Sequence, residues 1–524
     1  MNSDTVTRLS AAARFGPKEP VSGRHGAVCT SHPLATRAAA DMLRAGGNAC
    51  DAALTAAAVQ TVVEPHMTTA AGVLGLLYYD AATAKTTYLN ASINAPLAGV
   101  GPLTEDTVGT GLGVAVPGWW AGFEAAAYAW GSRPLAALLA EAIGLADEGF
   151  PIHAFLYGMM FEQVGRVGST PAGRDVFFRD GQLRDPGDDL RQPALAETYR
   201  RLVREGSDFY YRGAFADEYC ALVQAAGGRV AVEDFRRYEV MWQTPVEGSY
   251  RGRRVLGSPP PDAGGLHVIE ALNMLEHVDL RALGRPQESA ETLALMMAVC
   301  QEVLGSQAVL RDPGRYEPVV GVLTSKAYAE ARLALLSPTD LPGPAGPPGT
   351  AHIVVVDAAG NAASLLHSLS AMPWDNGLFV GGVSIPAAGT HFLRACPRPG
   401  ERAVKYVAPT MLFDGPSPSL VMGSPSVSIV ANIVQNVVNV VDFGDDLATS
   451  VGRPRFGNVW DGGQLVEADF GPDLLSAVAA RGVGLNVTSP WSVHNGSFEA
   501  VAIDGTGLRS ACADPRRAGS AEVT

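Results

Sequence analysis

The chain has 524 residues, of which 47% are hydrophobic and 18% are charged, and its formal net charge at pH 7 is −14. This composition supplies enough apolar material for a large core and excludes a disordered chain. The acidic balance disfavours nucleic acid and anionic membranes as partners.

The first predicted element, at residues 1–20, is a polar N-terminal segment with no apolar stretch long enough for a signal-peptide core or a membrane span. The cysteines of the chain have neither the spacing of a metal site nor that of a redox pair. Cys50 lies in an alanine-rich stretch, where a small core residue is expected. We therefore expect a reduced, cytoplasmic protein with no bound metal.

Hydrophobic periodicity predicts a chain that mixes helices and strands. Helices are expected at 33–42, 49–62, 134–148 and 189–206, with a β-hairpin at 72–89. Further along, the pattern predicts strands at 351–357, 362–368 and 418–423 and a helix at 426–442. These elements favour a layered α and β architecture without selecting one such fold.

A Pro/Gly-rich run at 341–349 leads directly into Thr350 and an apolar segment at 353–356. Four prolines and three glycines in this run exclude a helix or a central strand, so we expect an exposed segment. A threonine at such a junction can become a new N-terminus after backbone cleavage, and its α-amine can then activate its own hydroxyl. The alternative is an ordinary threonine that opens a strand.

Short motifs accompany this junction along the rest of the chain. They are Ser31-His-Pro-Leu-Ala35, Leu43-Arg-Ala-Gly-Gly-Asn-Ala-Cys-Asp-Ala-Ala53, Val62-Val-Glu-Pro-His66, Val114-Ala-Val-Pro-Gly118, Ala146-Asp-Glu-Gly-Phe-Pro-Ile152, Phe209-Tyr-Tyr-Arg-Gly213, Ala225-Ala-Gly-Gly228, Tyr250-Arg-Gly252, Pro259-Pro-Pro-Asp-Ala-Gly-Gly265, Pro409-Thr-Met411, Met422-Gly-Ser-Pro425 and Arg453-Pro-Arg-Phe456. In this order and spacing they resemble the γ-glutamyltranspeptidase family of N-terminal-nucleophile hydrolases. The resemblance covers nearly the whole chain, and the series is far more specific than any one motif.

The resemblance implies an α+β fold, a four-layer αββα sandwich of two antiparallel sheets packed face to face between helices. It also implies that the Gly349–Thr350 bond is the autocleavage point and that Thr350 is the nucleophile. The chain would then form a heterodimer of its own fragments, a large segment at 1–349 and a small segment at 350–524, within one globular unit. A nucleophile that carries its own amine needs no metal or organic cofactor.

Three more residues match the family's catalytic machinery. Ser368 matches a hydroxyl residue that hydrogen-bonds the nucleophile, although a serine at this place on a strand can also be a surface hydroxyl. The family's oxyanion donors, backbone N–H groups after a Gly-Ser-Pro turn, map onto Ser426 and Val427. The turn here reads Gly423-Ser-Pro-Ser-Val427, which is stiffer and bulkier than the family's Gly-Ser-Pro-Gly-Gly.

The substrate-binding positions depart from the family pattern. The arginine that holds the substrate α-carboxylate is replaced by Ser92, which cannot make a bidentate charged contact. An asparagine of the family becomes Ser370, and a pair of serines becomes Lys405 and Tyr406. The family's acidic residue for the substrate α-ammonium falls near His391. The loss of both clamps argues against a γ-glutamyl substrate.

Some side chains near these positions allow two interpretations. Lys405 and Arg402 are candidates for binding an anionic group of the substrate, but a lysine at this kind of position is often a surface residue. Trp374 and Tyr406 either line the pocket or pack in the core. His352 and His367 are expected to be structural residues. His66 is expected to be a structural, hydrogen-bonded residue rather than a metal ligand.

Three functions remain open. The first is an N-terminal-threonine hydrolase for a small non-glutamyl metabolite. It resembles the clamp-deficient actinobacterial enzymes of the alkylproline pathways behind lincomycin-type and pyrrolobenzodiazepine-type antibiotics, which are understood to release an oxalyl unit by C–C bond hydrolysis. The second is a γ-glutamyl hydrolase or transferase acting on glutathione-like peptides. The third is a processed but inactive binding homologue, and the presence of Thr350 and Ser368 argues against it.

Overall fold

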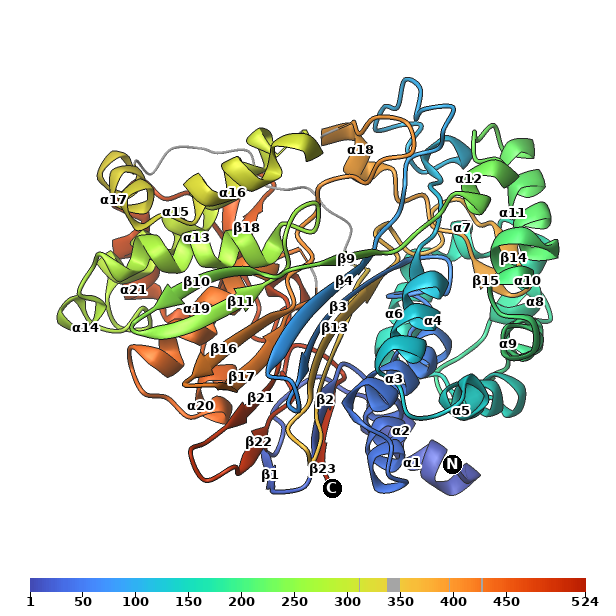
Figure 1. Cartoon of the computed structure of the whole chain (residues 1–524), viewed down its shortest axis with the longest axis horizontal. Helices are drawn as coiled ribbons and strands as arrows, with labels where there is room; N and C mark the ends of the chain where they lie inside the picture. Colours follow the sequence, from blue (N-terminus) through green and yellow to red (C-terminus); the bar gives the residue numbers. More distant parts are fainter. Residues whose placement is uncertain (311, 337–348, 395, 426) are drawn as a thin grey trace.

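Two seven-stranded antiparallel sheets form the centre of the molecule (Figure 1). The structure, a computed structural model, describes residues 1–310, 312–336, 349–394, 396–425 and 427–524. The first sheet has the order β1 (Val21–Gly23), β22 (Arg509–Ala511), β21 (Glu499–Ile503), β17 (Ser417–Gly423), β16 (Thr410–Asp414), β11 (Arg253–Gly257) and β10 (Val246–Tyr250). The second has the order β23 (Ser520–Val523), β2 (Ala27–Thr30), β12 (Ala351–Val356), β13 (Ala362–Ser368), β3 (Val73–Asp80), β4 (Lys85–Ala91) and β9 (Met241–Gln243).

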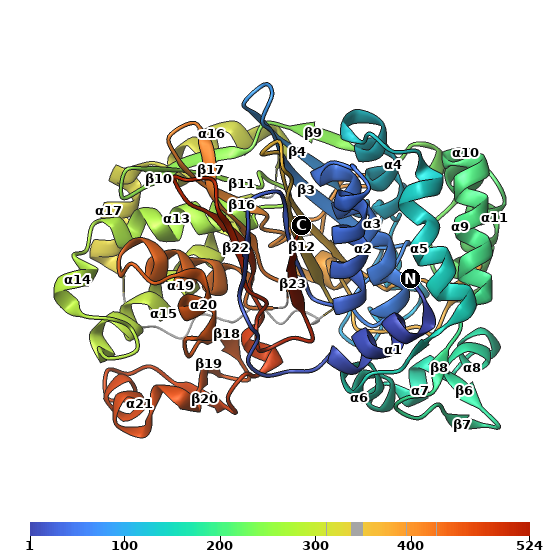
Figure 2. The ribbon, with the colours of Figure 1, turned by 90° about the horizontal axis from the view of Figure 1, so that it is seen from below.

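Helices cover the outer face of each sheet, so that the molecule has four layers (Figures 1 and 2). The helices that share a core with the second sheet include α2 (Pro33–Arg44), α3 (Ala49–Val63), α4 (Trp119–Trp130) and α5 (Leu135–Glu148). Those that share a core with the first sheet include α13 (Gly264–Glu276), α15 (Ala290–Gly305) and α19 (Ile429–Val441). This arrangement confirms the αββα sandwich expected from the resemblance.

Shorter elements surround the four layers. The remaining helices are α1 (Ser3–Ala12), α6 (Ala154–Glu162), α7 (Val164–Val167), α8 (Pro171–Phe177), α9 (Pro193–Glu205), α10 (Ser207–Arg212), α11 (Ala214–Ala225), α12 (Val232–Arg236), α14 (Leu280–Leu283), α16 (Tyr316–Leu323), α17 (Lys326–Leu335), α18 (Thr390–Arg394), α20 (Leu447–Gly452) and α21 (Pro472–Ala479). The small strands are β5 (Phe150–Pro151), β6 (Phe178–Arg179), β7 (Gln182–Leu183), β8 (Asp189–Leu190), β14 (Phe379–Val380), β15 (Val383–Ser384), β18 (Phe456–Trp460), β19 (Gly463–Glu467) and β20 (Leu485–Thr488).

Strand β12 shows why its sequence is a continuous apolar run. Its side chains alternate between two cores, because successive residues of a strand point to opposite faces. Ile353 and Val355 pack with the helices outside the second sheet. Val354 and Val356 pack against the first sheet, in the core between the two sheets. A strand that is buried on both faces needs apolar residues at every position.

The register of the second sheet aligns four positions at one end of its central strands. Ala351 pairs with His367, Ser368 pairs with Val73, and Leu74 pairs with Ala91. Thr350 precedes Ala351 and Ser92 follows Ala91, so Thr350, Ser368, Val73 and Ser92 lie in one row across β12, β13, β3 and β4. Three spacings of about 4.8 Å put the two ends of this row about 14 Å apart.

The element predictions mostly hold, with boundary errors at two helices. The hairpin, the strands and the first two helices are confirmed within a few residues. The helix expected at 189–206 begins at Pro193, because residues 189–190 pair with Phe150 and Pro151 as a short strand. The helix expected from 426 begins at Ile429. Residues 341–348 of the Pro/Gly-rich run lie outside the described residues, so their expected exposure stays a prediction.

One helical segment is long and apolar enough to be compared with a membrane-spanning helix. Within the described residues, Ala290–Val309 passes the length and hydropathy test for a membrane span, and 61% of its window is buried in the protein. A helix buried in a core passes the same test. Its side chains pack with the first sheet, as expected of a core helix.

Candidate active site

Thr350 lies at the entry to β12 and faces the carbonyl group of the residue before it. Its hydroxyl oxygen Oγ1 donates to the Gly349 carbonyl oxygen at 2.8 Å, and the residue is 7% exposed. A Cβ on Gly349 would lie 3.0 Å from the Ala371 carbonyl oxygen, so the glycine allows a tight fit here. The structure thus holds the proposed nucleophile beside the peptide bond that it would cleave.

Ser368, at the end of β13, completes this arrangement. Its Oγ lies 3.0 Å from Thr350 Oγ1, and it also donates to the Gly349 carbonyl oxygen. The backbone N–H of Ser370 donates to Ser368 Oγ at 2.8 Å. Ser368 is 4% exposed as a residue, so it is not a surface hydroxyl. Both hydroxyls polarise the same carbonyl group, and the Ser370 N–H fixes Ser368.

The turn after β13 explains how Ser370 reaches this position. Ser370 has φ = 55°, in the left-handed region that non-glycine residues seldom adopt. This conformation turns the chain back so that its N–H points at Ser368. Backbone strain of this kind costs on the order of 1–3 kcal/mol and is concentrated at functional sites. The structure therefore gives Ser370 a positioning contact beside the nucleophile, through its backbone.

His352 supports the same region from the core between the sheets. Its Nε2 lies 3.0 Å from Ser364 Oγ, and Ser364 donates to the Met422 carbonyl oxygen at 2.8 Å. Burial lowers the pKa of His352 to about 3, so the ring is neutral. A Cβ on Gly423 would lie 2.0 Å from the His352 ring. Gly423 therefore lets the backbone after β17 approach the strand that carries Thr350.

His367 is a structural residue, as predicted, and the structure shows that it is hydrogen-bonded. Its Nδ1 accepts from Trp119 Nε1 at 3.1 Å and from Thr68 Oγ1 at 2.8 Å, and its Nε2 donates to Gln60 Oε1 at 2.7 Å. Burial lowers its pKa to about 3. Gln60 in turn donates to Glu64, whose pKa is raised by burial. The sequence indicated the motif around Glu64, but no signal assigned a role to Gln60.

The oxyanion loop follows β17 and leads into α19. Ser426 lies outside the described residues, so its expected role stays a prediction. Val427 is half-buried and precedes the first residue of α19 by two positions. Its carbonyl oxygen accepts from Asn458 Nδ2, which anchors the loop. The N-terminus of a helix stabilises negative charge, so this position suits an oxyanion donor.

Ser92 and Lys405 lie within one buried polar cluster. The backbones of Asp262 and Lys405 form an isolated parallel β-bridge. The Ser92 hydroxyl faces the Asp262 carboxylate. Lys405 is 1% exposed, so the surface-lysine interpretation is wrong. Burial lowers the pKa of its amine to about 7. Arg402, which the sequence singled out as a second cation, lies in the same cluster.

Tyr406 and His391 lie around this cluster and make other contacts. Tyr406 is half-buried, and its hydroxyl donates to Gln307 Oε1 at 2.6 Å. His391 is half-buried on α18, whose Phe392 packs with Val73. Helix α18 therefore covers the same end of the second sheet where Thr350 and Ser92 lie. The substrate roles of Tyr406 and His391 stay predictions.

Trp374 and His66 both pack in the protein core, and the contacts of His66 differ from those expected. Trp374 is 3% exposed and packs on Phe177 with ring centroids 5.1 Å apart, which supports the packing interpretation. His66 was expected to be a hydrogen-bonded residue, and this prediction is wrong within the part of the chain that the structure describes. Neither of its ring nitrogens has a hydrogen-bond partner there. Its ring instead packs edge-on against Phe155 at 4.8 Å.

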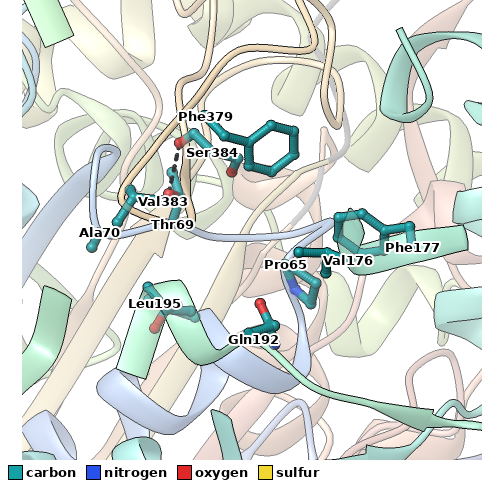
Figure 3. Close-up of a pocket in the computed structure, with 12 residues that line it drawn as sticks. Pro65, Thr69, Ala70, Val176, Phe177, Gln192, Leu195, Phe379, Val383 and Ser384 are labelled. Atoms are coloured by element: carbon teal, nitrogen blue, oxygen red, sulfur yellow. Dashed lines mark hydrogen bonds between the residues drawn. The ribbon is translucent and has the colours of Figure 1, made fainter. Parts of the chain in front are cut away.

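The pocket in Figure 3 is separate from the Thr350 site. It lies among the Pro65–Ala70 segment, the start of α9 and the β14–β15 hairpin, where Thr69 Oγ1 donates to the Ser384 carbonyl oxygen at 2.8 Å. Its volume of ≈ 10 Å³ suits a single water at most. Among the described residues, no group of three or more His, Cys, Asp or Glu side chains could hold a metal ion.

Comparison with known proteins assigns the family. The family model of Gamma-glutamyltranspeptidase matches residues 35–524. The chain is 30% identical to the glutathione hydrolase proenzyme of Bacillus subtilis (strain 168), covering 95% of this chain and 91% of that protein. It is 31% identical to the acylase ACY 1 proenzyme of Pseudomonas sp. (strain SE83), covering 94% of this chain and 93% of that protein.

Solved structures agree with this assignment. Cephalosporin acylase from Bacillus halodurans has a TM-score of 0.85 and 26% identity, and the match covers 97% of each chain. The structure of LmbA2991HD shares the fold with a TM-score of 0.82 and 22% identity, over 97% of this chain and 100% of that chain. The chain therefore belongs to the gamma-glutamyltranspeptidase family and is a hydrolase of the N-terminal-nucleophile type.

Proposed function

We propose that this protein cleaves itself at the Gly349–Thr350 bond and then uses Thr350 to hydrolyse a small non-glutamyl metabolite. The observation that carries the proposal is the pair of hydroxyls, Thr350 and Ser368, on the Gly349 carbonyl group. The products of cleavage are fragments of 349 and 175 residues (524 − 349 = 175). These fragments stay together as a heterodimer, because β12 lies between β2 and β13 in one sheet.

The geometry at Gly349 and Thr350 supports self-cleavage by the following steps. Thr350 Oγ1 adds to the Gly349 carbonyl carbon, the peptide C–N bond breaks, and the hydroxyl proton ends on the Thr350 nitrogen. Water then opens the ester and leaves a carboxylate on Gly349 and a free amine on Thr350. This amine is the base that activates Thr350 Oγ1 in later turnovers. The backbone N–H groups that precede α19 stabilise the oxyanion.

The substrate class is proposed from the two missing clamps. Ser92 stands where the family's arginine would hold an α-carboxylate, and no carboxylate lies between Asp375 and Glu401 in the sequence. We propose C–C bond hydrolysis that releases an oxalyl unit in secondary metabolism. Thr350 Oγ1 adds to a ketone as its proton passes to the Thr350 α-amine, the C–C bond breaks, and the carbon leaving group departs as a stabilised carbanion that takes up this proton. Water then hydrolyses the oxalyl ester.

The test uses acetylpyruvate as a minimal oxalyl compound. Hydrolysis of its C2–C3 bond, between the 2-keto group and the methylene carbon, consumes one water and gives oxalate and acetone. The wild-type protein should release oxalate, and Thr350→Ala should not. A wild-type protein that is fully cleaved and releases no oxalate would contradict the C–C step.

A second candidate is γ-glutamyl hydrolysis, which the similarity to a glutathione hydrolase proenzyme favours. Release of glutamate from glutathione by the wild-type protein would support it. Ser92, at the position that the resemblance assigns to the family's arginine, argues for slow turnover of such substrates. The cytoplasmic location expected from the sequence stays a prediction.

A further inference from the structure

Strand β18 lies beside the loop that carries the expected oxyanion donors, and its pairing with β19 is irregular there. Residues 456–459 of β18 pair with residues 464–466 of β19, so three steps along one strand match two along the other. The extra residue forms a β-bulge at 457–458. A bulge turns a side chain out of the regular alternation of a strand, and bulges are common beside active sites. The bulge therefore gives Asn458 a direction that a regular strand would not.

Asn458 holds two consecutive residues of the loop. Its side-chain Nδ2 donates to the Val427 carbonyl oxygen, and its backbone N–H donates to Ser428 Oγ at 3.1 Å. Ser428 Oγ in turn donates to the His494 carbonyl oxygen at 3.1 Å. Asn458 is 4% exposed and Ser428 is 0% exposed, so water does not compete for these contacts.

Gly457 allows β18 to approach the loop this closely. A Cβ on Gly457 would lie 2.5 Å from Ser428 Oγ and 3.0 Å from Asn495 Oδ1, so a larger residue would push the loop away. The Gly457 carbonyl oxygen accepts from Gln464 Nε2, which fixes the bulge against β19. The glycine thus has a steric role beside the loop.

Helix α19 holds both β18 and the first part of the loop. Gln435 Nε2 donates to the Phe456 carbonyl oxygen at 2.8 Å, and the Phe456 N–H donates to Gln435 Oε1 at 3.1 Å. Asn432 Nδ2 donates to Ser424 Oγ at 3.1 Å. The loop is therefore held by Asn432 near its start and by Asn458 near its end, and Gln435 joins the two supports.

The contact between Asn458 and the Val427 carbonyl group also decides where the next N–H points. The peptide bond between Val427 and Ser428 is trans, so its C=O and N–H bonds point in opposite directions. Because the Val427 carbonyl group is turned toward β18, the Ser428 N–H points away from that strand. This N–H directly precedes α19, whose N-terminus favours negative charge. Without the Asn458 amide, this peptide unit would be free to rotate.

The other end of the loop is tied to the strand that carries the nucleophile. The loop leaves β17 at Gly423, where a Cβ would lie 2.0 Å from the His352 ring. His352 lies two residues after Thr350, on the same face of β12. The loop therefore begins beside the strand of Thr350 and ends on Asn458.

We propose that Asn458 is a positioning residue for the oxyanion. It holds the peptide unit of Val427 and Ser428 so that the Ser428 N–H stabilises the charge that forms on the Gly349 carbonyl oxygen when Thr350 attacks. Asn458 itself touches no reacting atom. The inference rests on the proposed function for the attack by Thr350, and the bulge, the glycine and the amide contacts carry the rest.

The test is the rate of self-cleavage, followed on denaturing gels from the full-length chain made by cell-free translation. Asn458→Ala removes the amide and keeps the backbone N–H, so self-cleavage should slow roughly ten- to hundredfold, as for a lost hydrogen bond that sets an oxyanion donor. Asn458→Gln keeps an amide and should retain part of the rate. Gly457→Ala should also slow cleavage, because its Cβ would displace Ser428. Thermal melts check that each variant folds.

A pH profile separates positioning from a general loss of stability. Asn458→Asp places a carboxyl group against the Val427 carbonyl oxygen. When ionised, this group has no proton to donate, whereas in its protonated form it donates as the amide does. The ratio of the Asn458→Asp rate to the wild-type rate should therefore rise as the pH falls through the pKa of the introduced carboxyl group. The corresponding ratio for Asn458→Ala should stay flat.

Matched controls make the same substitutions away from the loop. Asn486→Ala removes an amide that donates to the Trp460 carbonyl oxygen at 3.4 Å. Gly452→Ala adds a methyl group where a Cβ would meet nothing within 4 Å. Both controls should cleave at the wild-type rate.

The possible results separate this inference from the proposed function. Self-cleavage of Asn458→Ala at the wild-type rate, or a ratio for Asn458→Asp that does not change with pH, would overturn the inference and leave the proposed function standing. A wild-type chain that never cleaves would contradict the proposed function, and this inference with it.

Discussion

The two ends of the Thr350–Ser92 row differ in how they relate to the rest of the family. At one end, Thr350 and Ser368 match the family pattern and contact each other as the chemistry requires. At the other end, Ser92 and Lys405 depart from the pattern, and the cations come from a distant segment. In the proposed function, the bond-breaking chemistry of the family is kept while the residues at the substrate end of the row differ.

The strongest test of the conserved end is Thr350→Ala. It removes the hydroxyl that donates to the Gly349 carbonyl group, so both self-cleavage and turnover should be abolished. Intact-mass measurement should show a chain of 524 residues in the variant and fragments of 349 and 175 residues in the wild type. Thr350→Ser keeps a hydroxyl and should retain cleavage. A wild type that stays full-length while active would refute the assignment of the nucleophile.

Ser368→Ala should have the next largest effect. It leaves Thr350 Oγ1 without its neighbouring hydroxyl and the Ser370 N–H without its acceptor. Self-cleavage and turnover should slow roughly ten- to hundredfold, the cost of a buried hydrogen bond that contacts the reacting groups. The rates come from a time course of fragment formation on denaturing gels. Ser417→Ala, at an exposed position of β17, is the control and should cleave at the wild-type rate.

The substrate end of the row predicts a substrate order. Glutaryl-p-nitroanilide should exceed γ-glutamyl-p-nitroanilide in kcat/KM by roughly tenfold or more, because the added ammonium meets Arg402 and Lys405 of the buried polar cluster. Glutathione should be a poor substrate for the same reason. Initial rates measured with each of the two anilides give the ratio of kcat/KM that tests this order. If the γ-glutamyl compound were the better substrate, another residue would have to supply the ammonium clamp.

The smallest predicted effect is a pH dependence in the binding of glutarate, a five-carbon dicarboxylate, at the buried polar cluster around Lys405. The pKa of Lys405 is lowered to about 7 by burial, with Asp262 opposing that shift and Arg402 adding to it. The pKa of Asp262 is raised, chiefly by burial. A bound carboxylate favours the protonated form of both groups, so affinity should be highest below pH 7. Above pH 7 the association constant for glutarate should fall by up to about tenfold per pH unit.

Thermal shifts or calorimetry with glutarate between pH 6 and pH 9 check this dependence. Lys405→Met removes the group with the pKa near 7 and should flatten the profile over this range. A wild-type profile that rises with pH would contradict the assigned protonation states. Lys85→Met, at an exposed position of β4, is the control and should keep the wild-type slope.

Much of the catalytic end could be predicted from the sequence. The apolar run at 353–356 and the turn after it fix β12 and β13, because strands buried on both faces have a strong local signature. Once that hairpin is set, its register places Thr350 opposite Ser368 with no further information. The motif series also determined the family and hence the four-layer fold.

Only the tertiary structure decided the contacts between distant segments. Gln60 and His367 are 307 positions apart, and Tyr238 and Arg402 are 164 positions apart. Local periodicity cannot specify such pairs, because it reports which face of an element is buried and not which partner covers it. For the same reason the sequence did not decide whether Lys405 lies on the surface or in the interior. Its burial beside Asp262 follows from the backbone bridges of Arg402 to Asn94 and of Lys405 to Asp262, which no local pattern encodes.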